Sequence, residues 1–310
     1  MKFNEGLVSI LIPTFNREQY IEECILSAIN QTYQNIEIII VDNNSLDHTA
    51  NIIEKLAARD TRISFYKNPK NVGPIENWKK CLTYSSGEFI KFLFSDDLLA
   101  PNCIQSSIDK LLQHDASGVV SNIWICDDSG NKLKTVNYAK YFSNHTNQFE
   151  RYLMSVGMPV SPGCALFARN IFENRSIFEE YSNFTSENPF QHGVGPDLKM
   201  FLAAASLGPI VQLEQPVNIF REHEQSISTL TKKKRLIMLY NIARLDFLKS
   251  NGYEKMYKTT LGRVFFDYLL YGSSEISNFS IRVMELFNLR VMLGFLRRFF
   301  SILFSKISTS

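Results

Sequence analysis

The sequence predicts an α/β fold, a mainly parallel sheet flanked by helices, followed by a helical C-terminal region. Between residues 7 and 94, short apolar segments alternate with segments of helical periodicity. This order is typical of β-α-β units, in which the strands are parallel and the crossovers right-handed. Hydrophobic residues make up 45% of the chain, which is ample for a buried core and excludes general disorder.

Four segments rich in apolar residues predict the first strands. They span residues 7–12, 36–41, 62–66 and 88–94. The helices between them are predicted at residues 17–31, 47–59 and 75–84, where apolar residues recur on one helical face. The segment 36–41 is apolar almost throughout, as is typical of a strand in a sheet that is covered on both faces.

After residue 100 the regular alternation ends. Pro101 begins a helix, a frequent place for proline, and residues 127–131 have the composition of a hairpin turn. Residues 134–147 have no clear period and are expected to form a mobile loop. The remaining elements are predicted as strands at 118–126, 164–168, 210–213 and 217–221, and as helices at 149–156, at 197–207 and from 232 onward. We therefore expect one domain at residues 1–230 and a helical region at residues 231–310.

Charge and cysteine content limit the classes of protein. The net charge of +2 does not suggest nucleic-acid binding, which usually needs a concentrated basic surface. The five cysteines are scattered and include no C-x-x-C pair, which favours a reducing compartment and counts against a zinc site. The N-terminal residues lack the apolar segment and cleavage site of a secretory signal. A cytoplasmic protein with no nucleic-acid partner is expected.

Polar residues follow three of the predicted strands at their carboxyl ends. Asp96 and Asp97 follow one strand, Asp42 another, and Thr14 and Asn16 the first. Ligands of open α/β sheets bind at this edge, and paired carboxylates are suited to a hard divalent cation. We therefore expect an enzyme that handles a charged, phosphorylated small molecule. The alternative for each residue is a turn or helix-capping role, and Asn16 is placed to cap the helix at 17–31.

Several short motifs occur in a characteristic order. They are Val8 to Arg17, Gln31-Thr32-Tyr33, Ile40 to Asp47, Asn71-Val72-Gly73, Ser86 to Ile90 and Phe94 to Asp97. In order and spacing this set closely resembles the inverting, family-two glycosyltransferases. The resemblance implies the GT-A fold, which is a Rossmann-like, mainly parallel sheet flanked by helices.

The resemblance also implies a nucleotide-sugar donor, usually linked to UDP, and a divalent cation, Mn²⁺ or Mg²⁺. Asp42 would then contact the base. Asp97 is expected to bind the metal and Asp96 to contact the ribose or sugar of the donor. The cation would neutralise the charge that develops on the departing diphosphate. The other residues assigned to the nucleotide-sugar site are Pro13, Thr14, Asn16 and Asn71.

An inverting transfer needs a base that takes the proton of the acceptor hydroxyl. In family members this base is an Asp at the start of a helix, usually preceded by another acid. Asp197 has this position, although Pro196 replaces the preceding acid. Glu187 is the second choice. The alternative role of Asp197 is a helix N-cap or a favourable interaction with the helix dipole in the first turn.

The segment from Phe220 to Ser228 resembles the Arg-x-His motif of the same family. By this resemblance, His223 would complete the metal or diphosphate site and Arg221 would offset diphosphate charge. The alternative for a single histidine is a structural role.

The C-terminal residues are apolar but repeatedly interrupted by arginine. These charges exclude a membrane-spanning helix, which needs about 20 mostly apolar residues. We expect residues 289–304 to lie on a membrane surface, because phenylalanines there alternate with cationic side chains. The alternative is a helix pair packed on the catalytic domain or on another subunit.

The resemblance implies the transfer of a sugar, with inversion, to a hydroxyl of a growing cell-surface glycan such as a lipopolysaccharide O-chain or a capsule. The acceptor would be a glycan or a lipid-linked glycan at the inner face of the cytoplasmic membrane. A nucleotidyltransferase is one alternative, but the loop at residues 13–17 lacks the glycines expected for a triphosphate. A non-catalytic relative is the other, favoured only by Pro196.

Overall fold

The computed structural model describes residues 4–142, 148–154, 158–179, 194–223, 233–271 and 288–307. The strands are β1 Asn4–Thr14, β2 Ile36–Asp42, β3 Ile63–Lys67, β4 Gly87–Phe92, β5 Leu98–Leu99, β6 Gly118–Cys126, β7 Lys132–Val136, β8 Ala165–Ala168 and β9 Ile210–Arg221. The helices are α1 Ile21–Ile29, α2 Thr49–Ala57, α3 Pro74–Tyr84, α4 Cys103–Gln113, α5 Ala139–Phe142, α6 Gln148–Met154, α7 Pro196–Leu207, α9 Lys233–Ser250, α10 Glu254–Tyr271 and α12 Leu289–Ile307. Short 3-10 turns are η1 Pro162–Cys164, η2 Arg169–Glu173 and η3 Arg175–Ile177.

Within the described residues, the strands form one sheet in the order β3-β2-β1-β4-β8-β6-β9-β5, with β7 paired to β6. The first four strands are parallel, as the sequence predicts. Beyond β4 the sheet is mixed, because β8 runs antiparallel to both β4 and β6. The prediction of a mainly parallel sheet is therefore correct for the N-terminal part, where helical crossovers join the strands.

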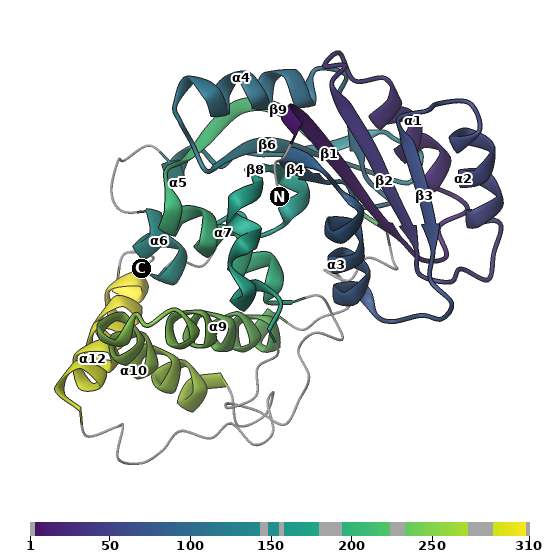
Figure 1. Ribbon diagram of the computed structural model, residues 1–310. Helices are drawn as coiled ribbons and strands as arrows, with labels where there is room; N and C mark the ends of the chain where they lie inside the picture. Colours follow the sequence, from purple (N-terminus) through teal and green to yellow (C-terminus); the bar gives the residue numbers. More distant parts are fainter. Residues whose placement is uncertain are drawn as a thin grey trace.

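The alternating side chains of the strands bury both faces of the sheet. Ile10 and Ile12 of β1 pack in one apolar cluster with α1, α2 and α4. Leu11 belongs to the second cluster, which includes residues of α3, α7 and α9. Figure 1 shows α4 on the opposite side of the sheet from α3 and α7. Burial on both faces explains the near-continuous apolar sequence of these strands.

Three expectations about local structure differ from what is observed. The helix predicted from residue 17 begins at Ile21 with Tyr20 as its N-cap, so Asn16 does not cap it. Asn16 instead has a φ of 50°, and its Oδ1 accepts a hydrogen bond from the backbone N–H of Leu46 at 2.9 Å. The two short strands predicted at 210–213 and 217–221 are one strand, β9. Of the segment expected to be a loop, the described part contains the end of β7 and α5.

The C-terminal helices are closely packed. Among them, α12 crosses α10 at two glycines. A Cβ added at Gly262 would lie 1.8 Å from the carbonyl oxygen of Val291, and one added at Gly294 would lie 1.9 Å from that of Thr259. The Nε of Arg298 also donates to Asp267 Oδ1 at 2.8 Å. No helix within the described ranges is long and apolar enough to cross a bilayer.

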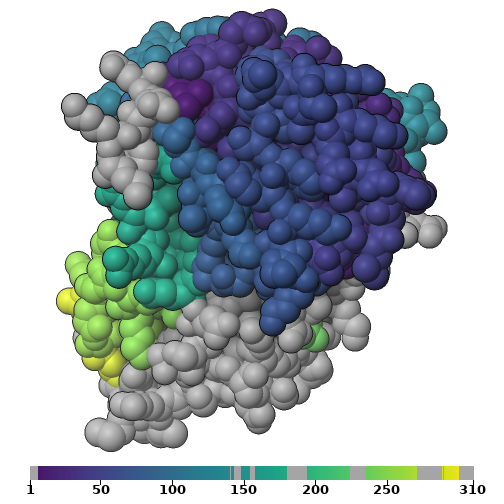
Figure 2. All heavy atoms as spheres, turned by 45° about the vertical axis from the view of Figure 1, so that its right-hand side comes forward, coloured from purple at the N-terminus to yellow at the C-terminus, as the bar shows by residue number. Residues whose placement is uncertain are grey.

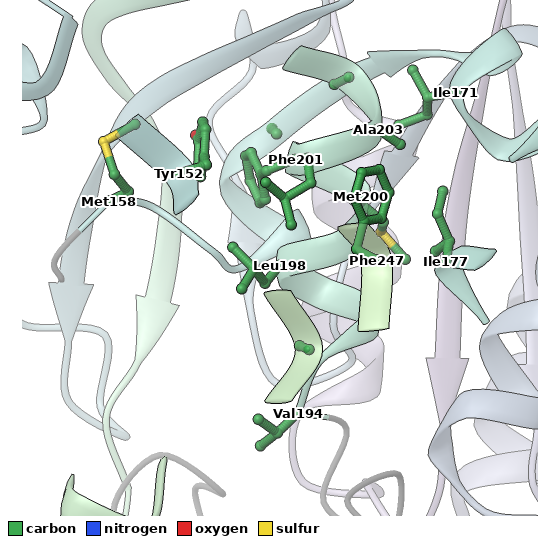
Figure 3. Close-up of a cluster of buried hydrophobic side chains, with 14 of the residues drawn as sticks. Tyr152, Met158, Ile171, Ile177, Val194, Leu198, Met200, Phe201, Ala203 and Phe247 are labelled. Atoms are coloured by element: carbon green, nitrogen blue, oxygen red, sulfur yellow. The ribbon is translucent and has the colours of Figure 1, made fainter. Parts of the chain in front are cut away.

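Helix α9 shares its buried surface with the domain before it. Figure 3 draws Leu198, Met200 and Phe201 of α7 together with Phe247 of α9, and all four belong to one apolar cluster. Figure 2 shows teal residues from the middle of the chain between the blue N-terminal surface and the light green C-terminal residues. The division at residue 230 stays a prediction, and the buried cluster continues across it.

Candidate functional site

The ends of β1 and β2 place Thr14 beside Asp42, because these two residues are partners in the parallel register. The carboxylate of Asp42 is fully buried and accepts the backbone N–H of Ser45 at 3.1 Å, as well as the Ser45 hydroxyl. Lys67 Nζ lies 3.9 Å from Asp42 Oδ2. The Oγ1 of Thr14 is buried and has no hydrogen-bond partner among the described residues, which leaves it available to a ligand. Pro13 is also buried in this strand end.

Asn71 lies at the same edge because a network of amide side chains fixes its loop. Asn43, which follows Asp42, donates from Nδ2 to Asn71 Oδ1 at 2.8 Å. Its Oδ1 accepts the backbone N–H of Val72 at 2.9 Å and the amide of Asn68 at 3.0 Å. The network connects the loop before α3 to the end of β2. The sequence pattern alone gives no signal for this role of Asn43, because its partners lie 25 to 30 residues away in the chain.

The acid pair Asp96-Asp97 lies in the turn between β4 and β5 and meets the end of β9. Asp97 Oδ1 accepts the backbone N–H of Arg221 at 3.0 Å. Asp96 Oδ2 lies 3.1 Å from His223 Nε2 and 3.5 Å from Arg17 Nε. The structure therefore brings together both acids and both members of the Arg-x-His segment.

The two carboxylates repel each other in a buried setting. Burial first, and then the negative charge of Asp96, hold the pKa of Asp97 well above its usual range, although the Arg221 N–H donor opposes this. No donor among the described residues contacts Asp97 Oδ2. Carboxylate oxygens such as those of Asp96 and Asp97 are donors that suit Mn²⁺ or Mg²⁺. No group of three or more such side chains in the described part of the chain has a ready-made metal geometry.

Tyr20, which lies in the segment predicted as the helix 17–31, is a residue of this site that the sequence pattern does not single out. Its ring stacks on the His223 ring at 5.3 Å between centroids, and Arg221 Cζ lies 5.1 Å from the Tyr20 ring centroid. The Tyr20 hydroxyl donates to Asp128 Oδ1 at 3.0 Å. Arg221 also pairs with Glu23 of α1. Tyr20 thus holds the end of β9 against the start of α1.

Asp197 lies in the first turn of α7. Its Oδ1 accepts the backbone N–H groups of Gly195 and Leu198, each at 2.7 Å, and its Oδ2 accepts the Tyr240 hydroxyl at 2.6 Å. Burial raises the pKa of Asp197 to about 6. No hydrogen bond or ion pair among the described residues joins Asp197 to the acid pair. Glu187 lies outside the described residues.

Comparison with protein families gives one match that covers more than half of the chain. The family described as "Glycosyl transferase family 2" matches residues 9–176. An uncharacterized glycosyltransferase of Haemophilus influenzae is 35% identical over 47% of this chain and 60% of its own length. A second one from that organism is 24% identical over 96% of this chain and 97% of its own length. The GalNAc(5)-diNAcBac-PP-undecaprenol beta-1,3-glucosyltransferase of Campylobacter jejuni is 36% identical over 33% of this chain and 34% of its own.

Solved structures share the fold at low sequence identity. Residues 1–349 of S. aureus TarS, in complex with UDP-GlcNAc, match 94% of this chain and 79% of that chain with a TM-score of 0.63 and 17% identity. The mannosyltransferase PcManGT of Pyrobaculum calidifontis, in complex with GDP-Man and Mn²⁺, matches 95% of this chain and 87% of its own with a TM-score of 0.52 and 13% identity. The expected GT-A type of α/β fold, with its helical C-terminal region, is confirmed.

Proposed function

Because the chain belongs to glycosyl transferase family 2 and is a glycosyltransferase, we propose that it transfers a sugar from a UDP-sugar to an acceptor hydroxyl with inversion at the anomeric carbon. The observation that carries this proposal is the meeting of Asp96 and Asp97 with Arg221 and His223 at the carboxyl ends of the strands. Such a cluster of paired acids, a guanidinium and an imidazole is suited to a diphosphate and its counter-ion.

In the proposed reaction, the acceptor oxygen forms a bond to the anomeric carbon on the face opposite the diphosphate. The bond between that carbon and the diphosphate oxygen breaks, and the nucleoside diphosphate leaves with the electron pair. Asp197 takes the proton of the acceptor hydroxyl. A base whose pKa lies at about 6 is largely ionised at neutral pH and still able to hold a proton.

The donor is assigned to the strand ends. Asp42 would accept a hydrogen bond from the base, with Pro13, Thr14, Asn16 and Asn71 around the nucleoside. Arg221 would offset diphosphate charge, and Asp96 would contact the ribose or sugar. Asp97 and His223 would hold a divalent cation, which when bound neutralises charge on the leaving diphosphate. The UDP-GlcNAc complex of TarS and the Mn²⁺ complex of PcManGT, both of similar fold, support this assignment.

The acceptor is proposed to be a lipid-linked or cell-surface glycan, handled at the inner membrane surface. The name of the Campylobacter jejuni relative, which includes PP-undecaprenol, supports this choice. Helix α12 exposes a row of apolar side chains beside the exposed cations Arg290 and Arg297. A face of this kind suits a membrane interface that contains anionic lipid. The exposed apolar residues are Met292, Leu293, Leu296 and Phe299.

The donor assignment is tested by UDP release across a panel of UDP-sugars, with Mn²⁺ or with a chelator, for the wild type and Asp97→Ala. We expect release that requires metal, occurs with one or a few sugars, and is lost in the variant. Asp109→Ala, on the exposed face of α4, is the matched control and should behave as the wild type. If UDP release is unchanged both by the chelator and by Asp97→Ala, the metal assignment is rejected.

Membrane contact is tested by sedimentation with vesicles that contain phosphatidylglycerol. The wild type should bind, and Leu293→Glu with Leu296→Glu should weaken binding about tenfold or more, because anionic lipid repels the two carboxylates that replace the exposed leucines. The same two changes should leave UDP release intact. Equal binding by the wild type and the variant would reject α12 as the contact surface.

A further inference from the structure

The C-terminal helical region supplies a side chain to the proposed base. Tyr240 belongs to α9, and its hydroxyl donates to Asp197 Oδ2 at 2.6 Å. The two residues are 43 positions apart, and Tyr240 lies beyond the 1–230 segment assigned to the catalytic domain. A short hydrogen bond from a hydroxyl to a carboxylate is among the stronger polar contacts in proteins.

Helix α9 is fixed against α7 by further contacts near this one. Lys199, two residues after Asp197, is fully buried and pairs with Asp246 of α9. Its Nζ also donates to the carbonyl oxygen of Ser176 at 2.8 Å. Phe247 of α9 packs in the same apolar cluster as Met200 of α7 (Figure 3). The position of Tyr240 relative to the first turn of α7 is therefore set by buried contacts on both helices.

The two carboxylate oxygens of Asp197 have different hydrogen-bond partners. Oδ1 accepts two backbone N–H groups, which occupy both of its lone pairs. Oδ2 accepts only the Tyr240 hydroxyl among the described residues, so one lone pair remains. The proton of an acceptor hydroxyl would therefore bind at Oδ2, and the direction of the free lone pair depends on where Tyr240 lies.

We propose that Tyr240 is a positioning residue for the transfer reaction, which orients Asp197 Oδ2 toward the acceptor hydroxyl and makes α9 part of the catalytic apparatus. This inference rests on the proposed role of Asp197 as the base. Tyr240 donates a hydrogen bond to the carboxylate and acts on the reaction through Asp197. The C-terminal region would then serve the reaction itself, independently of any membrane contact by α12.

The hydrogen bond also has an electrostatic effect that can be measured. Burial raises the pKa of Asp197 to about 6, while the Tyr240 hydroxyl and the backbone N–H groups of Leu198, Gly195 and Asp197 itself lower it. The nearby charged side chains of the two helices, Lys199 of α7 and Asp246 of α9, form an ion pair with each other. Loss of the Tyr240 hydroxyl removes a donor to the ionised form, so the pKa of Asp197 should rise further.

The decisive experiment is a titration of the Asp197 carboxyl by ¹³C NMR in protein labelled at aspartate. The signal that disappears in Asp197→Asn is assigned to Asp197. In Tyr240→Phe its midpoint should rise by about 1 pH unit, the size expected for one lost hydrogen bond to a charged group. Tyr253→Phe is the matched control, because Tyr253 is a half-buried tyrosine packed on Phe149 whose hydroxyl bonds to no described group.

A second variant keeps the test valid if Tyr240→Phe does not fold. Fluorotyrosine incorporated at residue 240 keeps the size of the ring and makes the hydroxyl a stronger donor, so the Asp197 midpoint should fall. Opposite shifts in the two variants, with Tyr253→Phe unchanged, would support the inference. A midpoint that stays at the wild-type value in both folded variants would overturn it.

A kinetic readout separates this inference from the proposed function. In Tyr240→Phe, transfer should fall about fivefold more at pH 6 than at pH 8.5, because a larger fraction of Asp197 is protonated at pH 6. If Asp197→Asn keeps full activity, the base assignment fails whatever the titration shows. If Asp197→Asn is inactive but the pH profile of Tyr240→Phe matches the wild type, the base assignment holds and the positioning role of Tyr240 is wrong.

Discussion

The strand ends and the surroundings of Asp197 are held by different kinds of contact. At the strand ends, Asp42 and Thr14 meet because β1 and β2 are parallel neighbours, and Ser45 completes the local structure three residues later. At Asp197, two backbone donors are local, but the third comes from α9, in a separate part of the chain. The parallel register and a local turn therefore place Asp42 and Thr14, whereas the surroundings of Asp197 depend on how two helices pack.

The largest effect expected is on turnover, and it would separate the two regions. Asp197→Asn should reduce transfer by about 10²–10⁴-fold, the usual contribution of a general base, because an amide cannot accept the proton. The affinity for UDP, measured by calorimetry, should stay unchanged, because no hydrogen bond or ion pair among the described residues joins Asp197 to the acid pair. A large loss of UDP affinity in this variant would show that the regions are not separate.

Next in size is the stability of the junction between α7 and α9. Lys199→Met should lower the free energy of unfolding by about 3–5 kcal/mol, because Asp246 would remain as a charge beside an apolar side chain. Adding Asp246→Leu should restore most of this loss, since buried ion pairs can often be replaced by apolar groups. Urea unfolding of both variants provides the measurement. If the single change is harmless, the pair does not hold the two helices together.

A further prediction concerns the pH dependence of stability. The pKa of Asp197 rises from 3.8 to about 6 on folding, so its ionisation opposes the folded state. This penalty is absent below pH 4 and grows until about pH 6, by roughly 3 kcal/mol at most. Asp197→Asn should therefore be about 1–3 kcal/mol more stable than the wild type at pH 8, and equal to it at pH 4. Thermal or urea unfolding at both pH values tests this. The same difference in free energy of unfolding between variant and wild type at pH 4 and at pH 8 would contradict it.

The smallest expected effect is at the strand ends. Tyr20→Leu should weaken UDP-sugar binding about five- to tenfold, because the stacked His223 and the nearby Arg221 lose their aromatic support. The maximal rate of transfer should change little. Tyr84→Leu, which removes a tyrosine stacked on Tyr66, serves as the control and should bind as the wild type. A changed maximal rate with unchanged affinity for the UDP-sugar would show that Tyr20 acts in the transfer step, as Asp197 does, and not in donor binding.

Much of the strand-end region can be predicted from the sequence, because the signals are local. Apolar segments define β1, β2 and β4, and a parallel sheet brings their carboxyl ends to one edge. The placement of Asp42, Asp96 and Asp97 at that edge therefore follows from the order of apolar and polar residues. The cap role of Asn16 was wrong, because a positive φ turns its side chain toward Leu46, which is 30 residues away in the chain.

Residues whose partners are distant could not be predicted in this way. Lys91 lies in a strand that appears apolar in the sequence, yet its Nζ is buried and donates to Asn218 Oδ1 at 2.7 Å, 127 positions away. Tyr20 likewise follows the apolar pattern of α1, and its contact with Arg221 and His223 exists only because β9 ends there. The periodicity of apolar residues shows on which face of a helix or strand a side chain lies. It does not show which other segment packs against that face.

The sequence by itself determined the α/β class, the order of the first strands and helices, and the acids at the strand ends, because each depends on neighbours within a few residues. Only the tertiary structure decided that β8 makes the sheet mixed, that α12 crosses α10 at Gly262 and Gly294, and that Tyr240 reaches Asp197. These features arise from packing between segments far apart in the chain. Close packing selects one arrangement of such segments, and the selection depends on the shapes of all the surfaces that meet.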